Sequence, residues 1–254
     1  MSKGGKRVAW VTGGGTGIGE AGAISLAEDG WSVVVSGRRK DALDAVAQKI
    51  KKAGGEAEAI VLDVSKAADV QKVADQILAK HGRIDLLVNS AGVNVPKRYW
   101  KETDAATFAD VVAINLTGAT ACTMVGLPGM RQRGRGTVIN VASFAGWVLG
   151  YLTGPAYTAS KAGMIALSHS FNIEECTNGL RATALCPGEV ATPILKKRPI
   201  EPSAEEKARM LQEEDLGRTI RFIAEMPPHV CINELVITPV WNRLYVGGDD
   251  LKRS

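Results

Sequence analysis

A tyrosine and a lysine four residues apart, Tyr157 and Lys161, are the side chains whose types and spacing most directly suggest chemistry. The sequence around them is predicted to form a helix, and residues at this spacing share one face of a helix. A phenol beside a fixed positive charge should have a pKa below its usual value of about 10, because the charge favours the phenolate. Tyr157 is therefore a candidate for proton exchange with a substrate near neutral pH. The same spacing also occurs on ordinary helix surfaces, so a solvated tyrosine and lysine are the alternative.

A glycine-rich segment near the N-terminus is a candidate phosphate-binding loop. It follows an apolar run at 8–11 closed by Thr12, and it opens a helical pattern. Such a loop brings the backbone and the helix N-terminal N–H groups close to a pyrophosphate, although the glycines could instead simply form a tight turn. The literal Gly-x-Gly-x-x-Gly string starts at Gly17 and falls inside the helix, and no Lys-Ser or Lys-Thr follows, which excludes a Walker loop. Dinucleotide contacts are predicted for Gly13, Gly15, Thr16, Gly17, Ile18 and Gly19.

Two arginines, Arg38 and Arg39, follow the second predicted strand at 31–36. NAD-binding units usually carry an acid about 20 residues after the glycines to hold the adenosine ribose. Guanidinium groups at this position instead suit a ribose 2′-phosphate. NADP(H) is therefore favoured as the cofactor, with NAD(H) as the alternative if both arginines are merely solvated.

The remaining chain alternates apolar runs with amphipathic stretches. Strands are predicted at 57–62, 84–88, 136–141, 181–185 and 230–237, and helices at 41–52, 67–80, 103–130, 157–176 and 204–224. This alternation predicts an α/β fold, a Rossmann-type doubly wound parallel sheet of about seven strands with helices on both faces. Ligand groups are then expected at the carboxyl ends of the strands.

The chain is predicted to form one domain over residues 1–254. The segment 189–225 carries Pro193, Pro199 and Pro202 and is predicted to be a mobile substrate loop followed by a helix. The tail at 241–254 is predicted to be irregular.

Composition argues against several classes of partner. The chain has a net charge of +4, but its basic residues are scattered and aromatics make up only 5%, so nucleic-acid binding gains no support. No run of eighteen apolar residues and no signal-peptide pattern is found, which predicts a cytoplasmic protein away from membranes. No C-x-x-C pair or histidine at ligand spacing accompanies the cysteines, so buried reduced thiols are expected rather than disulfides or a metal site, at Cys122, Cys176, Cys186 and Cys231.

The order of the motifs resembles the classical short-chain dehydrogenase/reductase family over roughly residues 6 to 240. The motifs are Thr12-Gly13-x-x-x-Gly17-x-Gly19, Asp63-Val64, Asn89-x-Ala91-Gly92, Asn115, Ser143, Tyr157-x-x-x-Lys161 and Pro187-Gly188-x-x-x-Thr192. The last predicted strand lacks the glycine-rich ending common in ketoacyl-carrier-protein reductases. It is more similar to the NADP-dependent 3-hydroxy acid (serine-type) dehydrogenase branch, which Arg38 and Arg39 also fit.

The resemblance implies roles for four residues. Tyr157 would exchange a proton with the substrate oxygen, and Ser143 would polarise that oxygen. Lys161 would lower the pKa of the tyrosine and hold the nicotinamide ribose, while Asn115 would position a relay water. Further cofactor contacts are implied for Asp63, Val64, Asn89, Ala91, Gly92, Pro187, Gly188 and Thr192. A homotetramer is also implied.

Besides its last strand, the chain departs from the family pattern in two places. Ser90 stands where the family often has asparagine, and the segment from Ser143 to Tyr157 is slightly longer than usual. Trp147, Leu149 and Tyr151 in this segment could lie over the substrate or merely pack nearby.

The expected activity is hydride transfer between NADP(H) and a secondary alcohol or ketone, possibly a 3-hydroxy or 3-oxo acid. An anionic substrate is suggested by basic loop residues, which could also be merely solvated: Lys97, Arg98, Lys196, Lys197 and Arg198. An NAD-dependent enzyme for another alcohol is one alternative. A non-catalytic dinucleotide sensor is another, although it would need neither Ser143 nor Tyr157. An epimerase or dehydratase is disfavoured because the chain leaves little room for an extended substrate domain.

Overall fold

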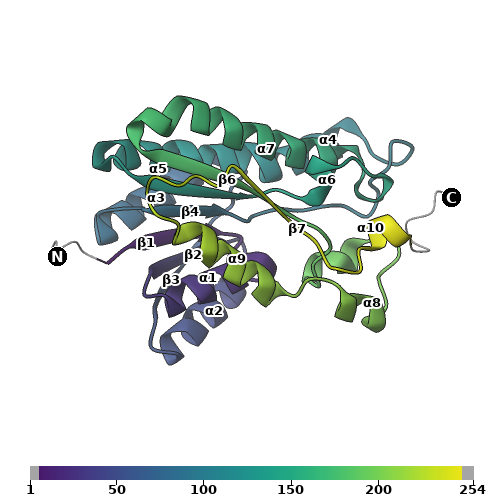
Figure 1. Ribbon diagram of the computed structural model, residues 1–254, viewed down its shortest axis with the longest axis horizontal. Helices are drawn as coiled ribbons and strands as arrows, with labels where there is room; N and C mark the ends of the chain where they lie inside the picture. The colour runs from purple at the N-terminus through teal and green to yellow at the C-terminus, as the bar shows by residue number, and fades with distance from the viewer. Residues whose placement is uncertain (1–5, 248–254) are drawn as a thin grey trace.

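A computed structural model describes residues 6–247 of the protein. Seven parallel strands form one sheet in the order β3-β2-β1-β4-β5-β6-β7, which confirms the predicted doubly wound topology (Figure 1). The strand order reverses between β1 and β4, where a ligand crevice is expected. The strands are β1 (Val8–Thr12), β2 (Ser32–Gly37), β3 (Glu56–Val61), β4 (Leu86–Asn89), β5 (Gly136–Val141), β6 (Leu180–Pro187) and β7 (Glu234–Ile237).

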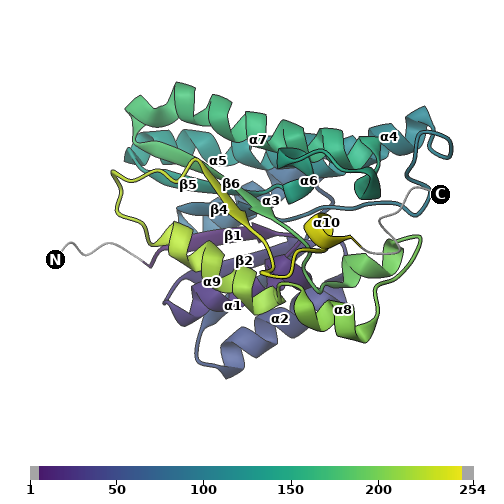
Figure 2. The ribbon, with the colours of Figure 1, turned by 45° about the vertical axis from the view of Figure 1, so that its right-hand side comes forward.

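Helices cover both faces of the sheet (Figures 1 and 2). Along β2, Val33 and Val35 face one layer and Val34 faces the other, because successive strand residues point to opposite faces. One layer contains α1 (Gly17–Glu28), α2 (Lys40–Lys52) and α9 (Glu213–Ala224), and the other contains α3 (Ala67–His81), α5 (Gly118–Arg133) and α7 (Pro155–Glu175). Buried strands of this kind read as near-continuous apolar runs, which is why the sequence identified them.

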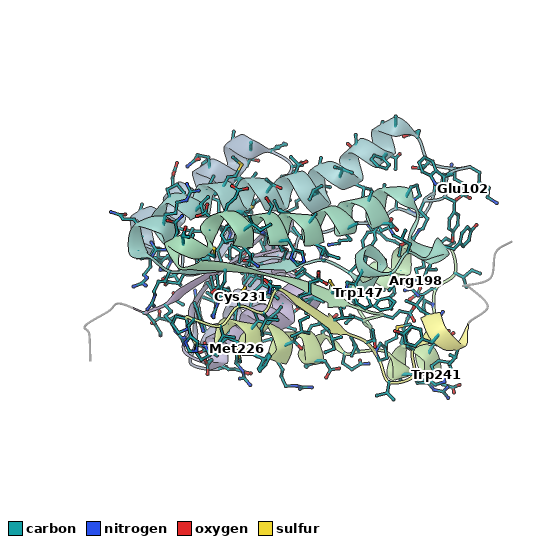
Figure 3. All side chains as sticks on the ribbon, turned by 45° about the horizontal axis from the view of Figure 1, so that its top comes forward. Glu102, Trp147, Arg198, Met226, Cys231 and Trp241 are labelled. Atoms are coloured by element: carbon teal, nitrogen blue, oxygen red, sulfur yellow. The ribbon has the colours of Figure 1, made fainter. Side chains whose placement is uncertain are left out.

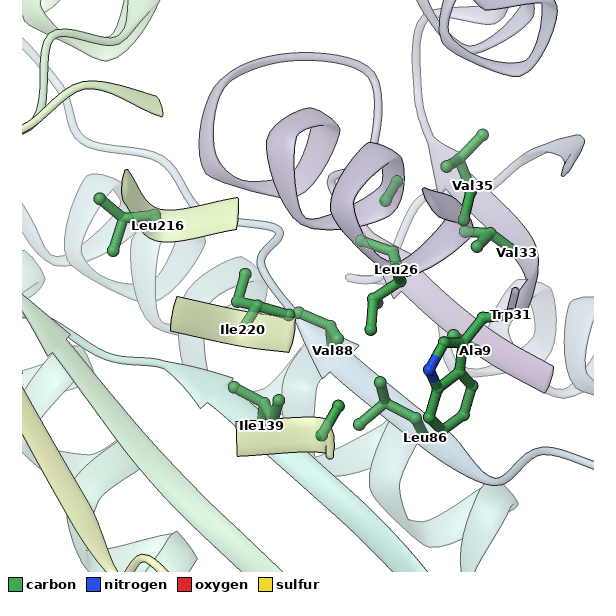
Figure 4. Close-up of a cluster of buried hydrophobic side chains, with 14 of the residues drawn as sticks. Ala9, Leu26, Trp31, Val33, Val35, Leu86, Val88, Ile139, Leu216 and Ile220 are labelled. Atoms are coloured by element: carbon green, nitrogen blue, oxygen red, sulfur yellow. The ribbon is translucent and has the colours of Figure 1, made fainter. Parts of the chain in front are cut away.

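The first layer has a well-filled apolar core. Leu26 of α1 and Ile220 of α9 pack with Val33, Val88 and Ile139 from three strands (Figure 4). This packing holds the glycine loop that precedes α1 against the sheet.

The predicted helix at 103–130 is interrupted. It consists of α4 (Ala105–Val112), a π-helical turn (Ala113–Thr117) and α5. Such turns often occur at functional sites, and this one carries Asn115. By length and composition alone, the stretch Ala105–Arg133 could also cross a membrane, yet Cys122 and Met130 of α5 pack in the core beside the sheet.

The predicted helix at 204–224 is two helices, α8 (Ala204–Arg209) and α9. The backbone between them leaves the helix because Leu211 bonds to the exit of β6. Its N–H donates to the Glu189 carbonyl at 3.1 Å, and its carbonyl accepts from Ala191 N–H at 2.9 Å. Each helix then starts with its own capping box.

Three further predictions need correction. The last strand covers only Glu234–Ile237, because the chain before it turns, with Val230 N–H donating to the Pro227 carbonyl at 2.9 Å. The tail predicted to be irregular contains the short helix α10 (Arg243–Val246), and its remainder at 248–254 lies outside the described residues. Cys122 and Cys186 are buried free thiols, whereas Cys176 and Cys231 are exposed because they lie in connections at the ends of elements.

Candidate active site

A cavity of about 480 Å³ opens at the carboxyl ends of the strands. Its walls come from the loops after β1, β2, β4, β5 and β6 and from α7, so segments distant in sequence meet there. Most of the predicted site residues line it: Gly13, Gly15, Thr16, Gly17, Ile18, Arg38, Arg39, Asp63, Val64, Ala91, Gly92, Ser143, Tyr157, Lys161, Pro187, Gly188 and Thr192. Gly19, Asn89 and Asn115 lie behind these walls.

The glycine loop has a backbone that only glycine accommodates well. Gly13 and Gly17 have φ values of 66° and 63°, in the left-handed region. A Cβ on Gly13 would lie 2.7 Å from the Ala91 Cα, and one on Gly19 would lie 2.4 Å from the Gly13 carbonyl oxygen. Gly19 therefore allows the loop to pack closely on α1. The result is a bare backbone concavity at the N-terminus of a twelve-residue helix, which suits a pyrophosphate.

Arg38 and Arg39 lie exposed at the edge of the cavity, directly after β2. Arg39 Nη2 donates to Thr16 Oγ1 at 3.3 Å, which ties this arginine to the glycine loop. The Ser65 hydroxyl is the main reason that the pKa of Asp63 is lowered, and the charge of Arg38 adds to the effect. The two guanidinium groups thus form a positive rim at one end of the cavity, a place that fits a 2′-phosphate.

Asn89 and Asn115 support the exit of β4. Asn89 Nδ2 donates to Asn140 Oδ1 at 2.8 Å and does not reach the cavity. Asn115 Oδ1 accepts from Val93 N–H at 2.8 Å, and its Nδ2 donates to the Val93 carbonyl at 3.0 Å. A Cβ on Gly92 would lie 3.4 Å from Lys161 Nζ and 3.6 Å from Asn115 Oδ1, so both polar atoms lie close to Gly92.

Ser143, Tyr157 and Lys161 share the inner wall of the cavity. Ser143 follows β5, and its hydroxyl accepts from Ala145 N–H at 3.1 Å. Lys161 Nζ donates to the Val141 carbonyl at 2.7 Å and lies 5.6 Å from the centre of the Tyr157 ring. Burial lowers the pKa of Lys161 to about 8.

Burial also raises the pKa of Tyr157, which corrects the expectation of a lowered value. The interaction with Ser143 and the charges of Arg198 and Arg98 pull this pKa down, but desolvation outweighs them. The lysine does not reverse the shift, because its ammonium is directed to the Val141 carbonyl. The phenol is therefore held in its protonated form in this structure.

Of the five basic loop residues singled out from the sequence, Arg98 and Arg198 line the cavity, whereas Lys97, Lys196 and Lys197 are solvent-exposed. Arg98 is only 5% exposed. Its Nε donates to the Val95 carbonyl at 2.8 Å and its Nη2 to the Lys197 carbonyl at 2.5 Å. Within residues 6–247, no carboxylate lies within ion-pair distance of it.

The three large residues singled out after Ser143, Trp147, Leu149 and Tyr151, are not among the residues that line the cavity. Trp147 and Leu149 are 50% and 77% exposed, and Tyr151 stacks on Tyr99 with ring centres 4.6 Å apart. Other residues of this segment line the cavity, including Phe144, Val148 and Leu152. The mobility predicted for the loop after β6 stays a prediction.

Sequence reasoning missed three residues near the cavity. Glu189, which follows the Pro187-Gly188 motif, accepts from Arg198 Nη1 at 2.7 Å. Arg243 lies 3.4 Å from the same carboxylate, and the adjacent Leu244 lines the cavity. Glu189 and Arg243 are more than fifty residues apart in the sequence, and no local sequence pattern predicts their contact.

Comparison with known proteins places the chain in a family. Residues 7–202 match the family model of short chain dehydrogenases. The chain is 36% identical over 216 residues to a cis-4-hydroxycyclohexanecarboxylate dehydrogenase from Sinomonas cyclohexanicum, covering 85% of this chain and 84% of that protein. It is 35% identical over 224 residues to a 3-oxoacyl-acyl-carrier-protein reductase from Synechocystis sp., covering 87% and 90%.

Solved structures agree with this assignment. A serine dehydrogenase in its closed form, complexed with NADP⁺, superposes with a TM-score of 0.85 at 27% identity, covering 97% of this chain and all of that one. The chain therefore belongs to the short-chain dehydrogenase family and is an oxidoreductase.

Proposed function

We propose that the protein interconverts a secondary alcohol and a ketone with NADP(H), and that its substrate carries a carboxylate, as a hydroxy acid or an oxo acid does. The observation that carries the proposal is Arg98, a buried guanidinium in the cavity with no carboxylate partner among the described residues. The cytoplasmic location and the homotetramer stay predictions.

The cofactor is NADP(H), which the residues of the cavity fit. The glycine loop offers bare backbone to the pyrophosphate, and Arg38 and Arg39 offer positive charge to the 2′-phosphate. The NADP⁺ in the related serine dehydrogenase supports this choice. Bound NADP(H) would supply or accept the hydride.

The protein's own part in the reaction is proton transfer and orientation. Tyr157, kept protonated by burial, gives its proton to the developing alkoxide, while the Ser143 hydroxyl hydrogen-bonds the same oxygen. Lys161 and Asn115 are buried and both lie close to Gly92, where they would relay a proton to the tyrosine. In the reverse direction Tyr157 accepts the alcohol proton.

Arg98 provides the argument for an anionic substrate. A buried charge without an ion partner is costly, and proteins rarely keep one without a use for it. Hydrogen bonds to the Val95 and Lys197 carbonyls hold the guanidinium in place but do not neutralise it. Arg98 and Tyr157 line the same cavity, and the charge of Arg98 acts to lower the pKa of the phenol. A substrate carboxylate would neutralise it there.

The names of two relatives support this proposal. A cis-4-hydroxycyclohexanecarboxylate dehydrogenase and a serine dehydrogenase both act, by name, on alcohols that carry a carboxylate. The ring or chain between the two groups differs between them, so the relatives support the substrate class and leave its carbon skeleton open.

The test compares oxo acids with their methyl esters. NADPH oxidation would be followed with 3-oxobutanoate, 4-oxocyclohexanecarboxylate and the methyl ester of each. We expect at least one acid to have a kcat/KM on the order of ten- to a hundredfold above that of its ester, because a charge-assisted hydrogen bond contributes about 1.5–3 kcal/mol. Arg98→Gln should remove this ratio, mainly by raising KM for the acid, with the ester little changed.

One control variant and two contrary outcomes complete the test. Lys97→Gln changes the neighbouring exposed basic residue and should leave the acid-to-ester ratio intact. Equal kcat/KM for every acid and its ester would refute the carboxylate. NADPH binding without turnover of any ketone would instead favour the sensor alternative.

A further inference from the structure

We infer that Leu244 is a specificity-determining residue and that Arg243 is a positioning residue that holds it in the substrate wall. The inference rests on the proposed function, since it concerns the same cavity. It assigns a task to the C-terminal helix α10, which none of the family motifs includes.

The helix α10 cannot hold its own position. It has only four residues, and helices this short are not stable without tertiary contacts. Asn242 caps it, with its Oδ1 accepting from Leu244 N–H at 3.0 Å. Its remaining attachments must therefore be side chains that reach other elements.

Arg243 supplies the main attachment. Its side chain is 2% exposed and lies between two carboxylates, with Nε 3.4 Å from Glu189 and Nη1 2.9 Å from Glu206. Glu189 is also buried, with 5% of its side chain exposed, and its Oε1 lies 2.7 Å from Arg198 Nη1. Arg198, Arg243, Glu189 and Glu206 thus form a linked set of ion pairs, in which Arg243 and Glu189 are buried and Arg198 and Glu206 are partly buried.

The network joins segments that surround the cavity. Glu189 belongs to the exit of β6, Arg198 to the loop beyond it, Glu206 to α8 and Arg243 to α10. The backbone of Glu189 is itself fixed, because its carbonyl accepts from Leu211 N–H at 3.1 Å. Arg198 and Trp241 lie at the end of the molecule that carries α10 (Figure 3).

A contact between two aromatic rings attaches α10 to the segment that follows β5. Tyr245 of α10 meets Phe144 edge-on, with ring centres 6.1 Å apart, and Phe144 directly follows Ser143. Leu244, next to Tyr245 in the chain, lines the same cavity as Ser143 and Phe144. Its side chain is apolar and 39% exposed, so it would contact the carbon skeleton of a bound substrate rather than a charged group.

The first test changes the size of residue 244. Leu244→Trp should lower kcat/KM for 4-oxocyclohexanecarboxylate at least tenfold more than for the smaller 3-oxobutanoate, and Leu244→Ala should not. The dissociation constant of NADPH should stay within about twofold. Equal effects on both substrates would overturn the specificity role. The same comparison on the methyl esters keeps the test valid if the carboxylate proposal fails.

The second test needs no turnover. Hydrogen exchange of the backbone amides at 245–247 would be measured in wild type, Arg243→Met and Arg243→Lys. We expect at least tenfold faster exchange in Arg243→Met and partial recovery in Arg243→Lys. The matched control is Arg218→Met, which changes an exposed arginine on α9 that pairs with Asp215 of its own helix. Exchange in Arg243→Met equal to wild type would overturn the positioning role.

Discussion

Replacement of both Arg38 and Arg39 by alanine should weaken NADPH binding and leave NADH binding nearly unchanged. Both guanidinium groups lie at the end of β2, where the adenosine ribose of a bound dinucleotide would lie. NADH lacks the 2′-phosphate, so it loses no interaction when the arginines are removed.

The magnitude follows from exposure. A hydrogen bond to a charged group contributes about 1.5–3 kcal/mol, but both arginines are exposed, which reduces each contribution to roughly 1 kcal/mol. Arg39 also donates to Thr16 Oγ1, so part of its hydrogen-bonding capacity is already used. Two such contributions total about 2 kcal/mol, or roughly a thirtyfold change in the dissociation constant.

The assay is a pair of dissociation constants, for NADPH and NADH, measured from the nicotinamide fluorescence of each complex. The values of kcat/KM for the two cofactors provide a second readout. Arg218→Ala, on the exposed face of α9, controls for the general loss of positive charge. Equal losses for the two cofactors, or a native preference for NADH, would refute the assignment of these arginines to the phosphate.

Two further predictions concern Tyr157 and Lys161 in the inner wall of the cavity. Tyr157→Phe should lower turnover by about 10²–10⁴ while the NADPH dissociation constant changes less than twofold, and a variant that keeps more than a tenth of native turnover would remove Tyr157 from the mechanism. Because the pKa of Lys161 is lowered from 10.5 to about 8, the unfolded chain binds more protons between these pH values, so this group's contribution to the free energy of unfolding rises by about 3 kcal/mol from pH 8 to 10.5. The free energy of unfolding, measured with urea at pH 7.5 and 9.5, should rise less in Lys161→Met than in wild type. Identical rises in the two proteins would contradict a buried Lys161 with a lowered pKa.

The inner strands of the sheet were predictable because they are buried on both faces, unlike the edge strands β3 and β7. Val33-Val34-Val35 is a continuous apolar run for this reason, and polar or glycine residues follow the strands where the ligand crevice lies. Parallel topology then brings Ser143, Arg38 and Gly92 to one edge although they are far apart in sequence. The residues that follow parallel strands can therefore be grouped into one site from the sequence alone.

The breaks inside helical patterns were not predictable in the same way. The apolar periodicity continues through 210–212, but Leu211 leaves the helix to bond with Glu189 and Ala191. That exchange of local for tertiary hydrogen bonds depends on where the exit of β6 lies in space. The place of α10 depends similarly on Glu189 and Glu206, which Arg243 reaches from the other end of the chain.

The pKa of Tyr157 shows the same limit at the level of one side chain. Helical spacing correctly places Lys161 on the same face of the helix as Tyr157. It does not fix the direction of the ammonium, which donates to the Val141 carbonyl. The charges that lower the pKa of the phenol are instead those of Arg98 and Arg198, which come from loops after β4 and β6. Burial outweighs both. The protonation of the predicted catalytic acid is thus set by the cavity as a whole, and a substrate carboxylate at Arg98 would weaken one of the two opposing charges and favour the protonated phenol further.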